Sequence, residues 1–186
     1  MVRKFSHKEL ERFFRAIDLE LNGPCTIVVI GGAALELRYA TRHATTDVDL
    51  WQNPGACFLK AVVRATKLSV IRIPISPTPI AEPPYNFEDR LHVVDIKGLE
   101  RLKVQVPEPH DLALLKVARG EAHDLEAISE MNEEMALSLE TLMERYKETR
   151  SQVTGPKGRF LLNFLALVAR LYGDDKASEV EKELEG

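Results

Sequence analysis

Two carboxylates separated by one residue, Asp47 and Asp49, are the side chains of this sequence best suited to binding a metal ion. They lie in residues 47–51, DVDLW, which we predict to be a strand. Side chains two positions apart on a strand point to the same face, and two carboxylates on one face repel each other unless a cation compensates. Because hard divalent cations prefer oxygen ligands, the pair predicts a site for Mg²⁺ or Mn²⁺ that could act on phosphates. The alternative is a solvated strand edge, where an isolated Asp-x-Asp is more often found.

Two adjacent glycines precede the carboxylates and could hold phosphate. Gly31 and Gly32 lie between residues 25–30, CTIVVI, a predicted buried strand, and residues 33–40, AALELRYA, a predicted helix. Glycine lets the backbone approach a ligand closely, and the N–H groups that begin a helix favour a phosphate. The glycines alone could form an ordinary tight turn. Glycines and carboxylates in this order indicate a site more specifically than either feature does.

Residues 27–51, IVVIGGAALELRYATRHATTDVDLW, resemble the signature of the nucleotidyltransferase superfamily, in which Gly-Gly or Gly-Ser is followed by Asp-x-Asp on the next strand. The closer likeness is to the AbiEii-like and related minimal nucleotidyltransferases of prokaryotic toxin–antitoxin systems. Their basic position falls on His43 here, with Arg42 beside it, and the sequence leaves open which of the two takes that role. Arg42 and Thr45, in the connector, could add charge and a hydroxyl near the metal.

Residues 107–128, PEPHDLALLKVARGEAHDLEAI, carry a second likeness to the same families, at Asp111, Lys116, Arg119 and Asp124. Lys116 and Arg119 are three apart on a predicted helix and share a face, where they could neutralise a triphosphate or a leaving pyrophosphate. Asp124 could cap the next helix, pair with Lys116, or act as a general base. Without the likeness, a surface helix with ordinary charges would explain these residues.

Asp95 is the candidate for a third carboxylate. The related fold often supplies one from a later strand, and Asp95 interrupts the apolar run of residues 91–96, LHVVDI. A buried carboxylate without a partner is costly, so a metal shared with Asp47 and Asp49 would satisfy it. The alternative is a strand-end aspartate in contact with water.

The resemblance implies the transfer of a nucleoside monophosphate from an NTP such as ATP to an acceptor, with release of pyrophosphate. The acceptor would be a tRNA 3′ end or a protein, and the chain would be a toxin–antitoxin component. The alternatives are an antitoxin that adenylylates a partner toxin and a non-catalytic member of the fold that binds a nucleotide or a partner. The implied catalytic residues are Asp47, Asp49, Asp95, Lys116 and Asp124, with metal on the first three and nucleotide on Gly31, Gly32, Arg42, Thr45, Lys116 and Arg119.

Composition sets broad limits on these expectations. The chain has 186 residues, of which 45% are hydrophobic and 29% charged, as in ordinary soluble domains. A formal net charge of −4 gives no overall positive field to attract nucleic acid, although a local basic patch could still do so. No apolar run approaches the roughly 18–20 residues of a membrane span, so a cytoplasmic protein without a membrane partner is expected.

The elements that must position these residues follow from hydrophobic periodicity and turn signals. The pattern becomes helical from Pro109 onward, after a proline-rich segment, residues 74–86, that reads as a loop. We predict an α+β fold in which a nucleotidyltransferase-like mixed sheet flanked by helices spans 1–108 and a helical part spans 109–186, as two domains or one continuous domain. The predicted helices of the first part are 6–21, 33–40 and 56–68, and the predicted strands are 25–30, 47–51, 70–75, 91–96 and 103–106.

Overall fold

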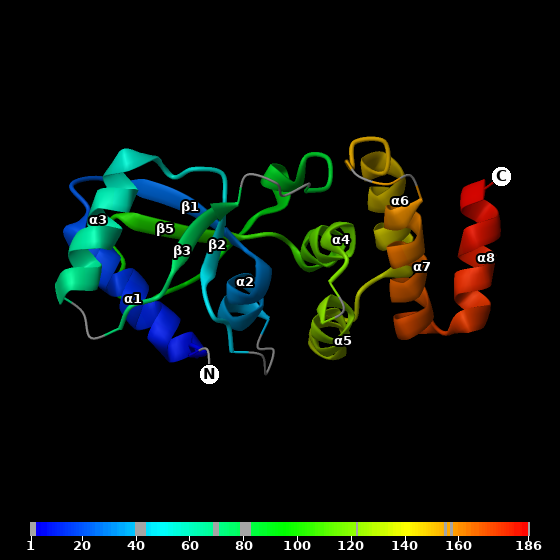
Figure 1. Cartoon of the computed structure of the whole chain (residues 1–186), viewed down its shortest axis with the longest axis horizontal. Coiled ribbons are helices and arrows are strands. Elements are labelled where there is room, and N and C mark those ends of the chain that lie inside the picture. Colours follow the sequence, from blue (N-terminus) through cyan, green and yellow to red (C-terminus); the bar gives the residue numbers. More distant parts are fainter. Residues whose placement is uncertain are drawn as a thin grey trace. The chain divides into compact units, whose positions relative to one another are not determined.

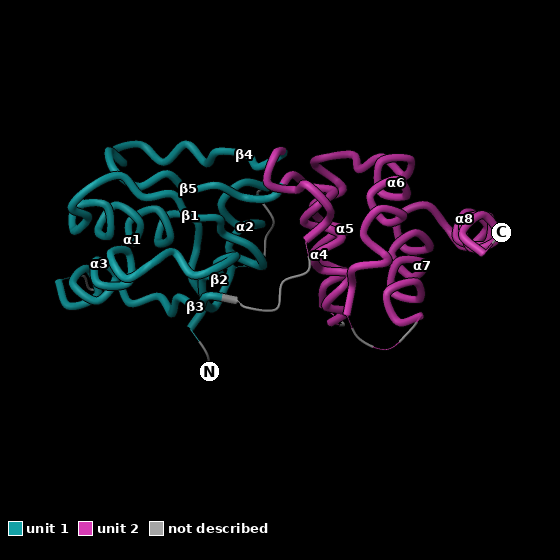
Figure 2. The backbone as a smooth tube through the Cα atoms, turned by 90° about the horizontal axis from the view of Figure 1, so that it is seen from above, with its two compact units in different colours: residues 1–81, 90–107 teal, residues 82–89, 108–186 magenta. Residues whose placement is uncertain are grey.

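The computed structural model of the chain describes residues 3–39, 44–68, 71–78, 83–121, 123–154, 156 and 158–185. The chain divides into two compact units, shown in different colours in Figure 2. Unit 1 comprises Met1–Ala81 and Arg90–Pro107, and unit 2 comprises Glu82–Asp89 and Glu108–Gly186. A short part of unit 2 therefore interrupts unit 1 along the chain.

Unit 1 is built on a five-stranded mixed sheet (Figure 1). Its elements are α1 (His7–Glu20), β1 (Cys25–Ile30), α2 (Gly31–Arg38), β2 (Val48–Trp51), α3 (Gly55–Leu68), β3 (Ile75–Thr78), β4 (His92–Val93) and β5 (Leu102–Val106). The strand order is β3-β2-β1-β5-β4. Strand β1 is antiparallel to β2 and parallel to β5, β2 is parallel to β3, and β4 is antiparallel to β5. The mixed sheet with flanking helices confirms the predicted α+β, nucleotidyltransferase-like fold.

The sheet has one buried face and one partly exposed face. Along β1, β2 and β5, buried side chains alternate with half-buried or exposed ones, apart from Cys25 and Ile30 at the two ends of β1, because successive side chains of a strand point to opposite faces. Helices α1 and α3 pack on each other and add apolar side chains to the same core. The buried face is aliphatic and consists of Ile27, Val29, Val48, Leu50, Leu102, Val104 and Val106.

Helix α1 is fixed at both ends. Ser6 and Glu9 form a capping box at its start. Near the other end, Asp18 is 2% exposed and accepts hydrogen bonds of 2.8 and 2.6 Å from the backbone N–H groups of Arg101 and Leu102. Burial raises the pKa of Asp18, but these hydrogen bonds outweigh burial and hold the pKa below its ordinary value. The turn before β5 is thereby anchored on α1.

Two strands differ from the sequence-based prediction. The strand expected at 70–75 forms instead at Ile75–Thr78, within the segment predicted as a loop. It contains Pro77, which a sheet tolerates because β3 is an edge strand. The strand expected at 91–96 is shortened to His92–Val93; the N–H of Val94 still donates to the carbonyl oxygen of Val104 at 2.9 Å.

Unit 2 is helical in its described part, as predicted for the C-terminal region. It contains η1 (Phe87–Arg90) in part, then α4 (Pro109–Arg119), α5 (Asp124–Met135), α6 (Leu139–Thr149), α7 (Arg159–Tyr172) and α8 (Asp174–Glu185). Helix α7 contacts α4, α5 and α8. Its Phe164 stacks on Tyr146 of α6 with ring centroids 4.3 Å apart, and both side chains are buried. Aromatic stacking thus joins α6 to α7 in the core of this unit.

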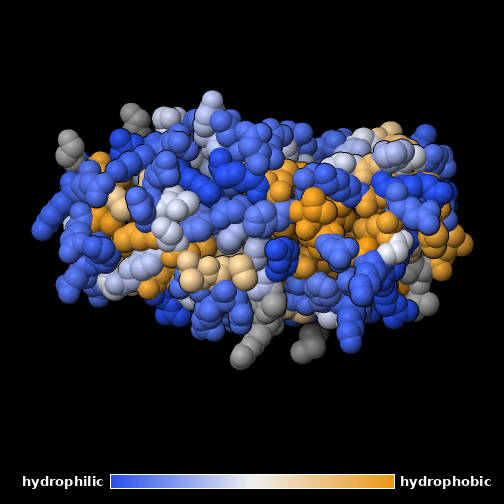
Figure 3. All heavy atoms as spheres, turned by 180° about the vertical axis from the view of Figure 1, so that it is seen from behind, coloured by the Kyte–Doolittle hydropathy of each residue, from blue (hydrophilic) through white to orange (hydrophobic). Residues whose placement is uncertain are grey.

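The surface is mostly hydrophilic, with apolar patches on the face that Figure 3 shows. The most exposed large apolar side chains of the described chain include Leu19 and Leu68, each 77% exposed, in unit 1 and Leu162, 67% exposed, in unit 2. Among the described helices, none is long and apolar enough to cross a membrane.

Candidate functional site

Gly31 brings the turn after β1 against the carboxylate of Asp49. Ile30, the last residue of β1, stands opposite Asp49 on β2. Gly31 has a φ of +68°, and a Cβ atom added to it would lie 3.0 Å from Oδ2 of Asp49. A side chain at this position would therefore require the carboxylate to shift, and the left-handed backbone also favours glycine. The predicted glycine turn and the predicted carboxylate strand meet at the same end of the sheet.

Gly32 makes the same kind of approach to Thr45. A Cβ atom added to Gly32 would lie 3.0 Å from Oγ1 of Thr45, whose hydroxyl donates to the carbonyl oxygen of Asp47 at 2.9 Å. The hydroxyl of Thr46 lies 3.4 Å from Oδ1 of Asp47. Thr45 is 7% exposed and pairs with Phe5 through two backbone hydrogen bonds. The turn that carries Asp47 is thus held in place from both sides.

The structure therefore gathers five of the predicted site residues in unit 1: Gly31, Gly32, Thr45, Asp47 and Asp49. Asp47 and Asp49 are both half-buried, whereas Val48 between them is fully buried. Asp49 lies on β2 and Asp47 on the bend just before it, and a shared metal ion on the two carboxylates stays a prediction. Arg42 and His43 lie outside the described residues.

Asp95 does not join this group. It follows β4, and the β4–β5 pairing continues to place it level with Lys103, which stands opposite Thr26 on β1. Asp49 instead stands opposite Ile30, four positions further along β1, so the two aspartates are roughly 13 Å apart along the strands with β1 and β5 between them. Asp95 is also exposed. The expectation that Asp95 shares a metal with Asp47 and Asp49 is incompatible with this strand order.

The strand next to β2 is β3, and its residue opposite Asp49 is Ser76. Residues opposite each other on neighbouring strands share a face of the sheet, so Ser76 stands beside Asp49 where a third carboxylate was expected. In the described ranges of the chain, no three His, Cys, Asp or Glu side chains are grouped closely enough to hold a metal ion. The described site is a pair of carboxylates flanked by a serine.

Lys116 and Asp124 form a buried ion pair in unit 2. Nζ of Lys116 lies 2.8 Å from Oδ1 of Asp124, and the two residues are 4% and 1% exposed. Arg119 donates to the same carboxylate, from Nε to Oδ2 at 3.0 Å and from Nη2 to Oδ1 at 2.5 Å. Of the alternatives for Asp124, the structure shows the pairing; the N-cap of α5 is His123.

The surroundings of this pair differ from those expected of a base or a triphosphate site. Burial raises the pKa of Asp124, but the hydrogen bond from Arg119 and the charge of Lys116 outweigh it, so the pKa lies below its ordinary value. The adjoining cavity, which Gly120 and Asn163 also line, has a volume of about 90 Å³. Ligand pockets usually measure about 300–1,000 Å³, so this cavity is smaller than a typical nucleotide pocket.

Asp111, matched only through the family likeness, belongs to a second buried network. It is fully buried, and Nη1 of Arg145 lies 3.0 Å from its Oδ1. The same guanidinium contacts Glu108, which caps α4 through the backbone N–H groups of His110 and Asp111. Nε2 of His110 accepts from the N–H of Ser138 at 2.8 Å, so the ring proton is on Nδ1 and is donated to Glu108 at 2.5 Å. These contacts join α4 to α6.

Sequence reasoning did not single out Ser76 or Arg145. Ser76 lies in a proline-rich segment, and only the pairing of β3 with β2 places it beside Asp49. Arg145 lies 34 positions after Asp111 on a helix with ordinary charges, so no local spacing links the two. Both are contacts between distant segments, for which one sequence carries no direct signal.

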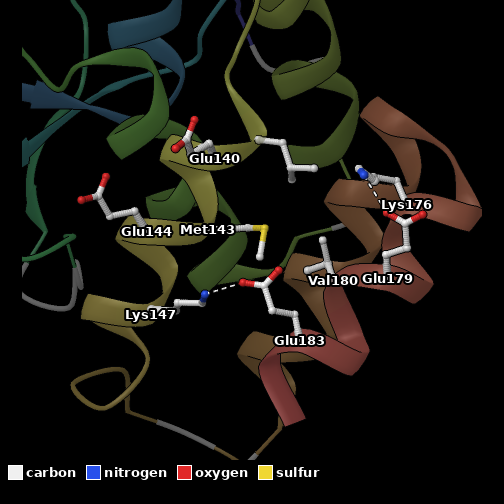
Figure 4. Close-up of a pocket in the computed structure, with 9 residues that line it drawn as sticks. Glu140, Met143, Glu144, Lys147, Lys176, Glu179, Val180 and Glu183 are labelled. Atoms are coloured by element: carbon white, nitrogen blue, oxygen red, sulfur yellow. Dashed lines mark hydrogen bonds and ion pairs between the residues drawn. The ribbon is translucent and has the colours of Figure 1, made fainter. Parts of the chain in front are cut away.

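A groove of about 540 Å³ lies between α6 and α8 in unit 2 (Figure 4). Its rim carries two ion pairs of 2.6 Å, Lys147 with Glu183 and Lys176 with Glu179. Two more glutamates, Glu140 and Glu144, also line the groove, so the acidic side chains outnumber the basic ones. The groove therefore offers a triphosphate no net positive charge.

A strand, a Gly-Gly turn and an antiparallel neighbour bearing Asp-x-Asp, on a mixed sheet flanked by helices, define a nucleotidyltransferase-like protein. Comparison with protein families agrees: the family described as "nucleotidyltransferase of unknown function (DUF6036)" matches residues 8–163. The chain belongs to this family. The match covers the glycine turn, the carboxylate strand and most of the helical part.

Comparison with individual proteins adds little. No curated protein matches the chain. Among solved structures, the crystal structure of JHP933 from Helicobacter pylori is similar over 98% of this chain and 100% of that one, with 15% identity and a TM-score of 0.34. At this TM-score the likeness supports no conclusion about this chain.

Proposed function

We propose that this chain is a metal-dependent nucleotidyltransferase, which transfers a nucleoside monophosphate from an NTP to an acceptor and releases pyrophosphate. The observation that carries the proposal is the approach of the Asp49 carboxylate to Gly31 at the turn between β1 and α2, in a chain that belongs to a nucleotidyltransferase family. This is where phosphates and a cation would have to meet.

The carboxylates of Asp47, just before β2, and Asp49, on β2, fit Mg²⁺ or Mn²⁺, because carboxylate oxygens are the ligands that hard cations prefer. Asp47 and Asp49 would hold the ion, which when bound would supply positive charge to the phosphates of the NTP. The backbone N–H groups at Gly31 and Gly32 would donate to a phosphate oxygen, and the absence of a side chain lets it approach. Arg42 would add positive charge, and Thr45 keeps the turn of Asp47 in place.

We further place the chain among the AbiEii-like and minimal nucleotidyltransferases of prokaryotic toxin–antitoxin systems, acting in the cytoplasm on a tRNA 3′ end or a protein. The motif of residues 27–51 supports this placement. The alternative within the same chemistry is an antitoxin that adenylylates a partner toxin. Growth arrest on expression that disappears with Asp47→Ala would identify a toxin; relief of a partner's toxicity that needs Asp47 would identify an antitoxin.

The reaction is tested by incubating the protein with each α-labelled NTP, Mg²⁺, total tRNA and candidate proteins. We expect label transfer that Asp47→Ala and Asp49→Asn abolish, while Asp95→Asn, a change of the same type in unit 1, leaves it intact. A wild type that labels nothing, or an Asp47→Ala variant that labels equally well, would overturn the proposal. Loss of transfer in Asp95→Asn alone would instead contradict the geometric exclusion of Asp95.

A second candidate function, nucleotide binding without transfer, is favoured by one observation. Ser76, not a carboxylate, stands opposite Asp49 on the neighbouring strand. Equilibrium dialysis with α-labelled ATP separates the two functions. Mg²⁺-dependent binding without label on any acceptor supports the binding function, whereas label transfer rules it out.

A further inference from the structure

Trp51 lies on the same strand face as Asp49, two positions further along β2. Val48 and Leu50 alternate with these two residues and are fully buried, whereas Asp49 and Trp51 are half-buried. Side chains at i and i+2 of a strand share a face and are about 7 Å apart along it. On this face of β2, the aromatic ring of Trp51 is therefore the next side chain after the carboxylate that would face the phosphates.

The neighbouring strands extend this face with side chains that are also accessible. The β1–β2 register, in which Val29 stands opposite Leu50, continues to place Val28 opposite Trp51. Val28 stands opposite Gln105 on β5, which stands opposite Val93 on β4. Val93 is 52% exposed, and Val28 and Gln105 are half-buried. The row across the sheet therefore combines an aromatic ring and two valines with a single amide.

We propose that Trp51, with Val28 and Gln105 on the next two strands, binds the nucleobase of the NTP and that Trp51 is its stacking partner. The inference rests on the proposed function, because it requires the triphosphate at Gly31 and Asp49. A base needs an apolar surface for its flat faces and polar groups for its edge. Trp51 and Val28 supply the apolar surface. Gln105 supplies the polar group, because its amide both donates and accepts hydrogen bonds. A nucleotide laid along β2 would then have its phosphates at Asp49 and its base at Trp51.

The first test uses the wild-type protein, because Trp51 is its only tryptophan and its fluorescence reports stacking directly. Each of the four NTPs is titrated with Mg²⁺ and no acceptor, beside inorganic tripolyphosphate with Mg²⁺, which carries phosphates but no base. We expect saturable quenching by NTPs and none by tripolyphosphate. Equal quenching by tripolyphosphate, or NTP binding without quenching, overturns the assignment of Trp51.

The second test replaces the ring. Base–aromatic stacking is worth about 1–3 kcal/mol, so Trp51→Leu should weaken NTP binding, measured by equilibrium dialysis with α-labelled NTP, roughly 5- to 150-fold. Trp51→Phe, which keeps an aromatic ring, should retain most of the affinity. In label transfer, Trp51→Leu should raise KM with little change in kcat. Binding by Trp51→Leu as tight as that of the wild type overturns the inference.

These measurements separate failure of the inference from failure of the proposed function. If the wild type binds no NTP by dialysis, the proposed function fails and the base site with it. The base site alone fails under a different combination of results. In that case the wild type binds NTP and Asp49→Asn does not, but NTP does not quench Trp51 fluorescence and Trp51→Leu binds NTP as tightly as the wild type. Far-UV circular dichroism checks that the variants are folded, and the wild-type titration decides the question without any variant.

Discussion

Gly31 is the residue at the carboxylate site whose replacement the structure constrains most. Two features disfavour any residue with a Cβ atom at this position. The φ angle is +68°, and an added Cβ atom would lie 3.0 Å from Oδ2 of Asp49. We predict that Gly31→Ala lowers the free energy of unfolding by about 1–2 kcal/mol, the cost of a left-handed backbone for a residue with a Cβ atom, and that it reduces label transfer by displacing Asp49. Urea denaturation and the transfer assay measure the two effects.

Gly23→Ala is the matched control for Gly31→Ala. An added Cβ atom at Gly23 meets nothing within 4 Å, and its backbone is not left-handed, so its stability should stay within about 0.5 kcal/mol of wild type. If Gly31→Ala were as stable and as active as Gly23→Ala, the close contact with Asp49 would not be a feature of the folded protein.

At the scale of elements, the pair Lys116–Asp124 joins α4 to α5. Removing the Lys116 ammonium leaves Arg119 on the Asp124 carboxylate, so the cost should be that of a hydrogen bond to a charged group, about 1.5–3 kcal/mol. We predict that Lys116→Met lowers the free energy of unfolding by an amount in this range, while Lys60→Met, on the exposed side of α3, changes it little. Urea denaturation measures both. A Lys116→Met variant of unchanged stability that transfers no label would instead show that Lys116 serves the triphosphate.

The contact of α4 with α6 should make stability depend on acid pH. Burial raises the pKa of Glu108, but hydrogen bonds from His110 and Arg145 outweigh it and lower the pKa from 4.5 to about 2. A carboxyl with a depressed folded pKa stabilises the fold above its unfolded pKa, and this contribution is lost as the pH falls through the folded pKa. For Glu108 the loss therefore falls between about pH 4.5 and pH 2.

We accordingly predict that Glu108→Gln is less stable than the wild type near neutral pH and that the difference shrinks as the pH falls through this window. Denaturant unfolding at a series of pH values, followed by far-UV circular dichroism, measures the difference. Glu133→Gln, an exposed change on α5, should show a small difference at every pH. A difference for Glu108→Gln that stayed constant down to pH 2 would contradict the role given to its ionised carboxylate.

The sequence predicted those elements whose evidence is local. Residues 25–30 form β1 because a short β-branched run bounded by glycine suits a buried strand. Asp49 meets Gly31 because β1 and β2, which are consecutive strands in the chain, pair with each other in the sheet. Asp95 and Ser76 could not be placed in this way: strand order, not chain order, decides which residues meet Asp49. The sequence did not predict β3 because a strand tolerates a proline such as Pro77 at the edge of a sheet, and the sequence does not show which strand is at the edge.

At the scale of the whole molecule, the two units carry different spectroscopic reporters. Trp51, the only tryptophan, lies in unit 1, whereas α4 to α8 of unit 2 contain more of the described helical residues than α1 to α3. Each unit has its own core, so they need not unfold together. We predict that denaturation curves followed by tryptophan fluorescence and by far-UV circular dichroism do not coincide, which is the test for departure from a two-state transition.

ATP with Mg²⁺ should then move only one of these transitions. A ligand that binds the folded state alone stabilises it by about 2.7 kcal/mol when present at 100 times its Kd, and the proposed site lies entirely in unit 1. The fluorescence transition should therefore shift to higher denaturant while the helical transition of unit 2 stays in place. Removing the metal with EDTA, or replacing Asp49 with Asn, should abolish the shift. Curves that coincide and shift together would show instead that the whole chain unfolds as one cooperative domain. Nucleotide binding in unit 1 would then stabilise the helices of unit 2 as well.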